Sequence, residues 1–186
     1  MGKSKWLVAG TLALGATAAF ADGSTFQITP FASESHLSVD HSIMRDGGNK
    51  RVENLEVGAR VGLRVPGGFL IEAGGAASPG ELITNWFKDV TMNHAEVAIG
   101  YQLDTPSGFR FVPKVGRMRW ELDGEGKAFV NSAGEFHRNY VGYDYFYEAA
   151  FMYNVKPKVA LGLVARSVDS DLIDARQVSF AVTMSF

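Results

Sequence analysis

Alternation of apolar and polar residues is the strongest pattern in this sequence, and it is clearest in residues 177–186, QVSFAVTMSF. The even positions of this segment are apolar, and the odd positions are polar or small. A period of two places one set of side chains on each face of a β-strand. The sequence therefore predicts a final strand with one apolar and one polar face, and the last residue, Phe186, belongs to the apolar face.

The same alternation predicts seven more strands along the chain. The clearest is Asn54–Val65, where the odd positions are aliphatic and the even positions carry three charges and two glycines. The other predicted strands are 24–33, 69–77, 94–103, 109–120, 140–155 and 159–168. Because proline has no amide donor, we expect Pro30 at a bulge or a poorly paired position of the first strand.

The connections between these strands alternate in length. Short turns are predicted at 66–68, 104–108 and 156–158, and longer connections at 35–50, 78–91, 121–138 and 169–174. Tight turns at one rim and long loops at the other are typical of up-and-down barrels. The predicted fold class is therefore all-β, an eight-stranded antiparallel up-and-down transmembrane β-barrel. Hairpins symmetric about Gly67, Pro106 and Pro157 would keep the aliphatic faces on one side of the sheet.

The first residues predict a cleaved signal peptide. Lys3 and Lys5 precede an apolar run from Trp6 to Ala19, and the tripeptide 19–21 (AFA) fits a cleavage site. The run is shorter than the roughly 20 residues of a spanning helix. We therefore expect residues 1–21 to be removed and residues 22–186 to form an outer-membrane β-barrel domain.

Net charge and cysteine content exclude several functional classes. The formal charge of −2 gives no support for nucleic acid as a partner. The sequence has no cysteine, which excludes a thiolate metal site, a cysteine nucleophile and disulfides. It also has no phosphate loop, paired-histidine spacing or nucleotide fingerprint, so no cofactor or metal is predicted. The mean hydropathy is near zero, as expected when lipid-facing and lumen-facing residues cancel.

Taken together, the eight strands, the alternating connections and the terminal Phe186 resemble the small eight-stranded barrels of bacterial outer membranes, of the OmpA/OmpX type. The likeness spans the mature chain and is one of pattern, without a diagnostic motif. It implies a barrel-only member in the bacterial outer membrane, among lipids and lipopolysaccharide. It also implies that the barrel-assembly machinery recognises the closing strand, with Phe186 as the assembly signal. We expect a monomer.

The alternative to a membrane barrel is a soluble carrier barrel, whose aliphatic face would form the core. Several aromatic residues lie on the apolar face beside the predicted turns or loops: Phe69, Tyr101, Phe109, Tyr143, Tyr145 and Tyr153. Transmembrane barrels carry aromatic girdles at these levels. The polar face combines glycines with long charged side chains, which suits a narrow lumen. Both observations favour lipid contact on the apolar face.

The polar faces carry five acidic and five basic residues that we expect inside the barrel: Glu56, Glu72, Glu96, Asp144, Glu148, Arg60, Arg64, Arg110, Lys114 and Arg166. An eight-stranded barrel has room for side chains and little else. Because buried charges are costly unless paired, these residues should form ion pairs. Glu148 and Arg166 are direct cross-strand partners in a hairpin centred on Pro157. The hypothesis is that this lumen ion-pair network fills and specifies the barrel.

Three functions suit such a barrel. The resemblance implies a structural protein that displays four extracellular loops and supports envelope integrity or surface contact. A narrow pore for small solutes or ions is the alternative, although a sign-balanced lumen argues against selective conduction. A lipid A-modifying enzyme is the third, with His94 and Glu96 or the loop residues His36, His41 and His137 as candidates. Lipid chemistry requires access from the lipid side, whereas His94 and Glu96 face the lumen, so no catalytic residue is predicted.

Overall fold

The computed structural model describes residues 23–44, 50–78, 90–124, 129–130, 136–137 and 139–186. One antiparallel sheet contains β1 (Thr25–Val39), β2 (Lys50–Arg64), β3 (Phe69–Ala77), β4 (Val90–Tyr101), β5 (Leu103–Asp104), β6 (Phe109–Gly124), β9 (Asn139–Lys156), β10 (Val159–Asp169) and β11 (Ile173–Ser185). Two short strands, β7 (Phe129–Val130) and β8 (Phe136–His137), pair with each other, and η3 (His41–Ile43) is a 3-10 turn. Among the described residues, no helix is long and apolar enough to cross a membrane. The predicted signal peptide, 1–21, lies outside the described residues.

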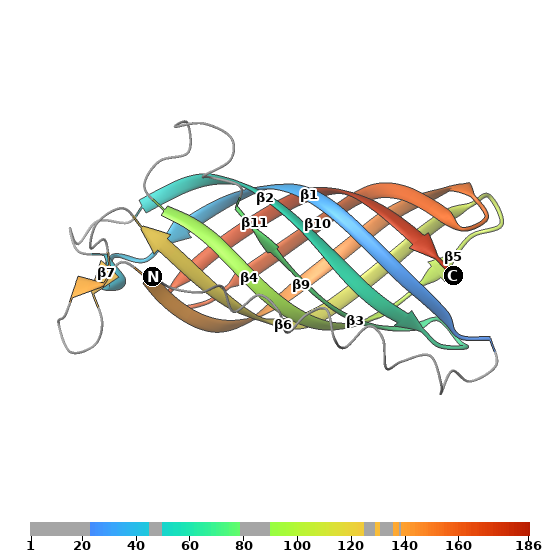
Figure 1. Cartoon of the computed structure of the whole chain (residues 1–186), viewed down its shortest axis with the longest axis horizontal. Coiled ribbons are helices and arrows are strands. Elements are labelled where there is room, and N and C mark those ends of the chain that lie inside the picture. Colours follow the sequence, from blue (N-terminus) through green and yellow to red (C-terminus); the bar gives the residue numbers. More distant parts are fainter. Residues whose placement is uncertain (1–22, 45–49, 79–89, 125–128, 131–135, 138) are drawn as a thin grey trace, which may run out of the picture.

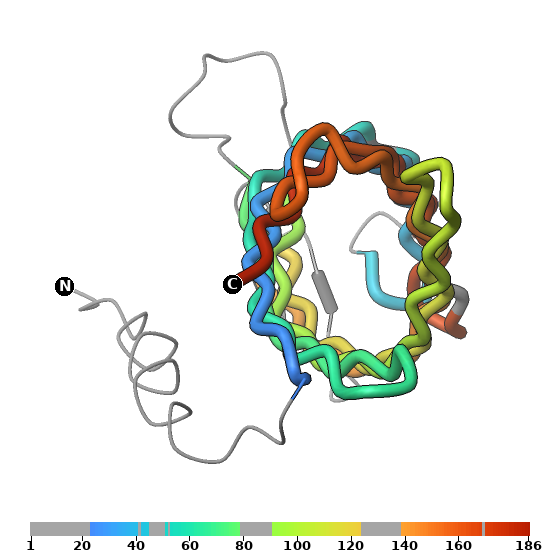
Figure 2. The backbone as a smooth tube through the Cα atoms, turned by 90° about the vertical axis from the view of Figure 1, so that its right-hand side faces the viewer, coloured from blue at the N-terminus to red at the C-terminus, as the bar shows by residue number. Residues whose placement is uncertain are grey.

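The sheet closes on itself into a barrel. The order of the strands follows the sequence, β1 pairs with β11, and β4 pairs with β6. β5 continues β4 after Gln102 and keeps its register with β6, so the two form one strand and the barrel has eight. Figure 1 shows the strands tilted around the barrel, and Figure 2 shows the closed ring from one end. The predicted eight-stranded antiparallel β-barrel is confirmed.

The strand registers set the tilt of the strands. Following paired residues once around the barrel leads from Gln27 through Gly62, Glu72, Ala98, Gly116, Phe146, Val168 and Ala175 back to β1 at Leu37. The path returns ten residues beyond Gln27, at Leu37. With about 3.3 Å per residue and about 4.8 Å between strands, this offset corresponds to a tilt of about 40°.

Three short hairpin turns lie at one end of the barrel, which we call the turn end, and the opposite end is the loop end. Gly67 and Gly68 both have positive φ, of 90° and 91°, which glycine adopts without a steric penalty. The hairpins centre on Gly67 and Pro157 as predicted, since Val57 pairs with Ala77 and Glu148 with Arg166. The β4–β6 hairpin instead centres on Ser107, because Leu103 pairs with Phe111. The predicted centre at Pro106 is therefore wrong by one residue, but the parity of the faces is unchanged.

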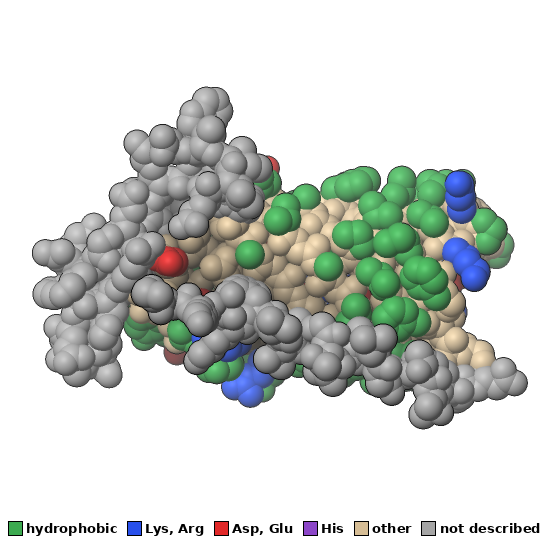
Figure 3. All heavy atoms as spheres, in the orientation of Figure 1, with side chains coloured by type: hydrophobic (Ala, Val, Ile, Leu, Met, Phe, Trp, Pro, Cys, Tyr) green, Lys and Arg blue, Asp and Glu red, His purple; other side chains and the backbone are tan. Residues whose placement is uncertain are grey.

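The charged faces point into the barrel and the aliphatic faces point outward. Ile99, Leu163 and Val178 are 61%, 57% and 59% exposed, whereas Glu56 and Arg60 are 0% and 2% exposed. A soluble barrel would have the opposite polarity, because burial of apolar surface drives folding in water. Figure 3 shows the apolar side chains gathered on the wall toward the turn end, with basic side chains at its edge.

Two apolar clusters fill the lumen on either side of the charged residues. The loop-end cluster consists of Leu37, Val39, Ile43, Met44, Met92, Ala98, Met118, Trp120, Leu122, Phe146, Val168, Ile173 and Ala175. The turn-end cluster consists of Phe31, Leu70, Ala76, Val112, Ala150, Met152, Ala160, Val164 and Ala181. The charges of the lumen therefore form a belt between two apolar layers.

Several strands extend into segments that were predicted to be loops. β1 continues to Val39 and β6 to Gly124, and β4 begins at Val90. In these extensions the outward residues, such as Glu34 and Glu121, are polar and the inward residues, such as Leu37 and Leu122, are apolar. The polarity of the two faces is therefore reversed relative to the apolar wall, although the pairing continues. Pro30 falls in a gap of the β1–β11 pairing, since the paired residues on either side of the gap are Ile28 and Phe31, which confirms the expected poorly paired position.

Candidate functional site

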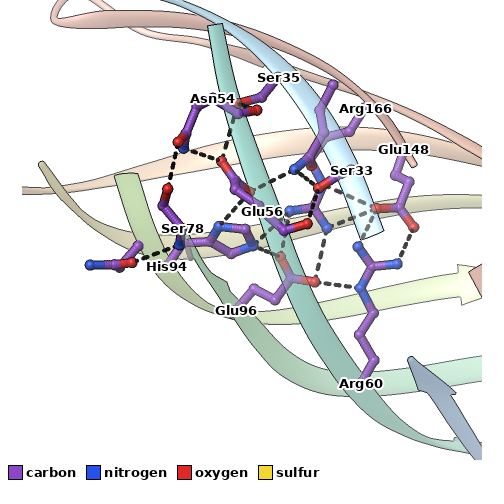
Figure 4. A network of polar contacts seen from close by, with 12 residues as sticks. Ser33, Ser35, Asn54, Glu56, Arg60, Ser78, His94, Glu96, Glu148 and Arg166 are labelled. Atoms are coloured by element: carbon purple, nitrogen blue, oxygen red, sulfur yellow. Dashed lines mark hydrogen bonds and ion pairs between the residues drawn. The ribbon is translucent and has the colours of Figure 1, made fainter. Parts of the chain in front are cut away.

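Glu148 of β9 and Arg166 of β10 form the centre of a buried polar network inside the barrel (Figure 4). The two residues are direct cross-strand partners. Arg166 Nε and Nη2 donate to Glu148 Oε2 at 3.0 and 2.8 Å. Because both side chains are buried, such charge-assisted bonds must offset the cost of removing the charges from water.

Glu148 is shared among three cations. Besides Arg166, Arg60 Nη1 donates to Glu148 Oε1 at 3.1 Å, and Arg60 Nη2 lies 2.9 Å from Oε2. Lys114 Nζ lies 3.0 Å from Glu148 Oε1. Arg60 belongs to β2 and Lys114 to β6, so one carboxylate connects four strands of the barrel.

Glu96 of β4 is the second shared carboxylate. Arg60 Nε donates to Glu96 Oε1 at 2.6 Å, and Arg166 Nη1 and Nη2 donate to Oε2 and Oε1 at 2.5 and 2.8 Å. His94 Nε2 lies 3.1 Å from Glu96 Oε2, and His94 Nδ1 lies 3.6 Å from Glu56 Oε2. The histidine therefore lies between two carboxylates of the network and has no access to the lipid side.

Glu56 extends the network through neutral polar side chains. It accepts hydrogen bonds from Ser35 Oγ at 3.1 Å, Asn54 Nδ2 at 3.1 Å and Gln177 Nε2 at 2.7 Å. Ser78 Oγ in turn donates to Asn54 Oδ1 at 2.8 Å. Neutral donors satisfy this buried carboxylate without adding positive charge.

Glu72 of β3 joins the network through Lys114, whose Nζ lies 2.5 Å from Glu72 Oε2. The central network therefore combines four carboxylates with three cations and one histidine: Glu56, Glu72, Glu96, Glu148, Arg60, Lys114, Arg166 and His94. The near balance of charge makes the burial of so many ionised groups tolerable.

Aromatic rings cover the two arginines of the network. The Phe31 ring centroid lies 4.4 Å from Arg60 Cζ, and the Phe146 ring centroid lies 4.1 Å from Arg166 Cζ. Desolvated cation–π contacts of this kind contribute up to about 2 kcal/mol. Phe31 belongs to the turn-end cluster and Phe146 to the loop-end cluster, so each apolar layer is in direct contact with the charged belt.

Three of the ten predicted lumen residues lie outside the central network. At the turn end, Arg110 Nε donates to Asp104 Oδ1 at 3.0 Å, and Arg64 Nη2 lies 3.3 Å from Asp104 Oδ2. Near the loop end, Asp144 accepts a hydrogen bond from Trp120 Nε1 at 2.6 Å. All three share the inward parity of the network but lie at other levels along the barrel.

The neutral members of the network are not evident from the sequence. Ser35 falls in a segment predicted to be a loop, so the alternation did not predict whether its side chain faces the lumen. Gln177 could be assigned to the polar face of the last strand, but its bond to Glu56 joins residues 121 positions apart. Only closure of the barrel brings these two side chains together.

Little space remains between these side chains. Lumen cavities among the described residues include one of about 20 Å³ near Arg60 and Lys114 and one of about 10 Å³ near His94 and Arg166. Each is about the size that a single water molecule requires. Within the described part of the chain, no group of histidine and acidic side chains is arranged as a metal site.

Of the remaining histidine candidates, His36 has a side chain that the structure describes. His36, predicted in a loop, lies on the outward face of β1, in register with Glu53 and Arg176. The side chains of His41 and His137 lie outside what the structure describes.

Phe186 lies where the last strand meets the first. Its backbone nitrogen donates to Phe26 O at 2.9 Å, and the two ring centroids are 6.4 Å apart. The ring is 63% exposed on the outer surface. The terminal residue therefore takes part in closing the barrel at the turn end.

No family model matches the sequence, and no curated protein is significantly similar to it in sequence. Solved structures that are similar to the whole barrel include the following three. Neisserial surface protein A (NspA) is 14% identical with a TM-score of 0.59, covering 89% of this chain and 100% of that chain. Ail, the attachment invasion locus protein of Yersinia pestis, in complex with the heparin analogue sucrose octasulfate, is 11% identical with a TM-score of 0.60, covering 88% and 99%. The outer membrane protein OprG of Pseudomonas aeruginosa is 12% identical with a TM-score of 0.53, covering 90% and 98%.

At such low identity the likeness establishes the fold alone. The resemblance expected from the strand pattern is confirmed at that level, together with its closed, all-antiparallel architecture. By its fold, this chain is a small eight-stranded β-barrel of the kind found in bacterial outer membranes.

Proposed function

We propose that this protein is an integral protein of the bacterial outer membrane whose barrel anchors four surface loops and supports envelope integrity or surface contact. The observation that carries the proposal is the polarity of the barrel. Along the middle of the barrel, charged side chains such as Glu56 and Arg60 are buried in the lumen, and aliphatic side chains such as Ile99 and Leu163 are exposed on the outer wall. Such a surface is unfavourable in water and favourable against acyl chains.

The aromatic residues of the outer wall support the same location. Pairs of rings lie next to the turn end, where Phe69 is 5.2 Å from Tyr101 and Phe109 is 5.1 Å from Tyr153 between ring centroids. Tyr and Phe side chains at this level are typical of the membrane–water interface. In this proposal the turn end faces the periplasm and the loop end faces the outside.

Export and assembly follow from the same proposal. Residues 1–21 direct export and are then removed, and residues 22–186 form the barrel domain. The barrel-assembly machinery recognises the last strand through Phe186, whose exposed ring remains accessible beside Phe26. The surrounding partners are outer-membrane lipids and lipopolysaccharide, and the protein acts as a monomer without nucleic acid.

A structural role is better supported than conduction or catalysis. The lumen cavities of about 20 and 10 Å³ are too small for solute passage, and a shared network of ion pairs separates them. His94 and Glu96 are buried, face the lumen and contact each other, so neither reaches the lipid side. The name of Ail refers to attachment and invasion, and a surface-contact role for this chain is compatible with that likeness.

The location can be tested with cells that express the full-length chain. An outer-membrane fraction should contain the protein, and its band should migrate faster on a gel when the sample is not heated. Purified protein in planar bilayers should give no stable conductance steps. A protein that stays dissolved without detergent would contradict the membrane location, and reproducible ion conductance would favour the narrow pore instead.

A further inference from the structure

The outer wall has a groove at the edge of its apolar surface that lies toward the loop end. The groove has a volume of about 450 Å³ and is lined by β4, β6 and β9: Ala95, Glu96, Val97, Arg117, Met118, Arg119 and Tyr143. The strand register brings the lining residues of the groove together. Arg119 pairs with Ala95 and Tyr143, and Arg117 pairs with Val97 and Tyr145. The small side chain of Ala95 leaves the hollow opposite the arginines.

The outward face of β6 changes from apolar to basic at this groove. Phe109, Phe111, Pro113 and Val115 precede Arg117 on the same face of the strand. Because these apolar residues face the acyl chains in the proposed location, Arg117 is the first outward charge at the boundary toward the loop end. Lipid headgroups begin at such a boundary.

Arg117 is held in place while its hydrogen-bonding edges stay available. Its Cζ lies 5.8 Å from the Tyr143 ring centroid and 5.7 Å from the Tyr145 ring centroid, within the range of cation–π contacts. A cation–π contact involves the face of the guanidinium, so its N–H edges stay free to bind an oxyanion. Among the described residues, Arg117 has no carboxylate partner, whereas Arg119 Nη2 lies 3.4 Å from Glu121 Oε2. The groove therefore offers a guanidinium without a counter-ion at headgroup level.

We propose that this groove binds the phosphate-bearing headgroup of an outer-leaflet lipid. Arg117 contacts the phosphate, Arg119 adds positive charge, and the lipid's acyl chains lie along Val97 and Val115 below. This inference rests on the proposed membrane location. It specifies which part of the wall binds the lipid and which chemical group of the lipid is bound.

The test uses the folded full barrel in detergent with three probes: diphosphoryl lipid A, the same lipid A without phosphates, and inorganic phosphate. Native mass spectrometry measures the apparent Kd of each. Wild-type protein should retain diphosphoryl lipid A at least fivefold more tightly than the dephosphorylated lipid. The variant Arg117→Gln should lose about fivefold in affinity, the effect of one basic side chain near an anionic surface, and Arg117→Lys should lose less.

Arg176→Gln is the matched control, because Arg176 is an outward arginine on β11, away from the groove and two residues from Asp174. It should bind diphosphoryl lipid A as the wild type does. Equal affinity of wild type and Arg117→Gln would overturn the inference, and so would an equal loss in Arg176→Gln. Binding of inorganic phosphate as tight as that of the lipid would overturn the lipid assignment.

Heat-modifiable migration of every variant separates the two proposals. If the wild-type chain forms no heat-modifiable barrel, the membrane location fails and the groove assignment fails with it. If all variants migrate as folded barrels but Arg117→Gln binds lipid normally, the headgroup site alone is wrong.

Discussion

Replacing Glu148 by glutamine removes one negative charge from the lumen while keeping the shape of the side chain. The carboxylate has direct contacts with Arg60, Lys114 and Arg166, at distances between 2.8 and 3.1 Å. Removing one partner of a buried ion pair costs about 3–5 kcal/mol, because the remaining charge stays buried. The affected cations here keep a second carboxylate, Glu96 or Glu72. The expected loss of unfolding free energy is therefore at the lower end, about 3 kcal/mol.

Urea unfolding of the barrel in lipid vesicles, followed by gel migration without heating, measures this loss. With an m-value of about 2 kcal/mol/M, the midpoint of Glu148→Gln should fall by about 1.5 M. Glu72→Gln is the matched control, because Glu72 contacts Lys114, which keeps Glu148. Glu72→Gln should lower the free energy of unfolding by about 1–2 kcal/mol. An unchanged midpoint for Glu148→Gln, or an equal loss in both variants, would refute the hub role of Glu148.

Three further predictions address the wall, the rim and the loop-end cluster. Leu163→Arg should lower the free energy of unfolding in vesicles by about 2–4 kcal/mol, measured by urea titration. Ser167→Arg, nearer the loop end on the same face, should lower it by less than about 1 kcal/mol. Asp104→Asn should cost less than about 1 kcal/mol in the same titration, because its carboxylate is a third exposed at the turn-end rim. Gly142→Ala should cost about 1–3 kcal/mol and alter the near-ultraviolet circular dichroism of Trp120, because an added Cβ would overlap the Trp120 ring.

The sequence by itself determined the strands, the direction of their faces and two of the three hairpin centres. Alternation is a local property, so it is readable wherever the outward residues are apolar, as in Val57 and Val61 of β2. The direct pairing of Glu148 with Arg166 could be derived because both residues belong to one tight hairpin. The same parity argument identified which charges face the lumen.

The residues at which the strands end were not predicted from the sequence, because the pattern changes where a strand leaves the apolar wall. Beyond the apolar wall, outward residues such as Glu34 on β1 are polar and inward residues such as Leu37 are apolar, so the aliphatic outward face that identified the other strands is absent. The strand nevertheless continues, because backbone pairing needs no apolar side chain. Periodicity alone therefore ended β1 several residues too early.

Only the tertiary structure decided which lumen residues meet. Arg60 and Glu148 are 88 residues apart, and Gln177 and Glu56 are 121 residues apart, on strands that hairpin geometry does not relate. The ten-residue offset on closing the sheet, from Gln27 to Leu37, sets the level of every strand relative to the others. That offset places Arg64 and Arg110 at the rim with Asp104 and places Arg60 in the central belt. It is a property of the closed cylinder and has no counterpart in the spacing of residues along the chain.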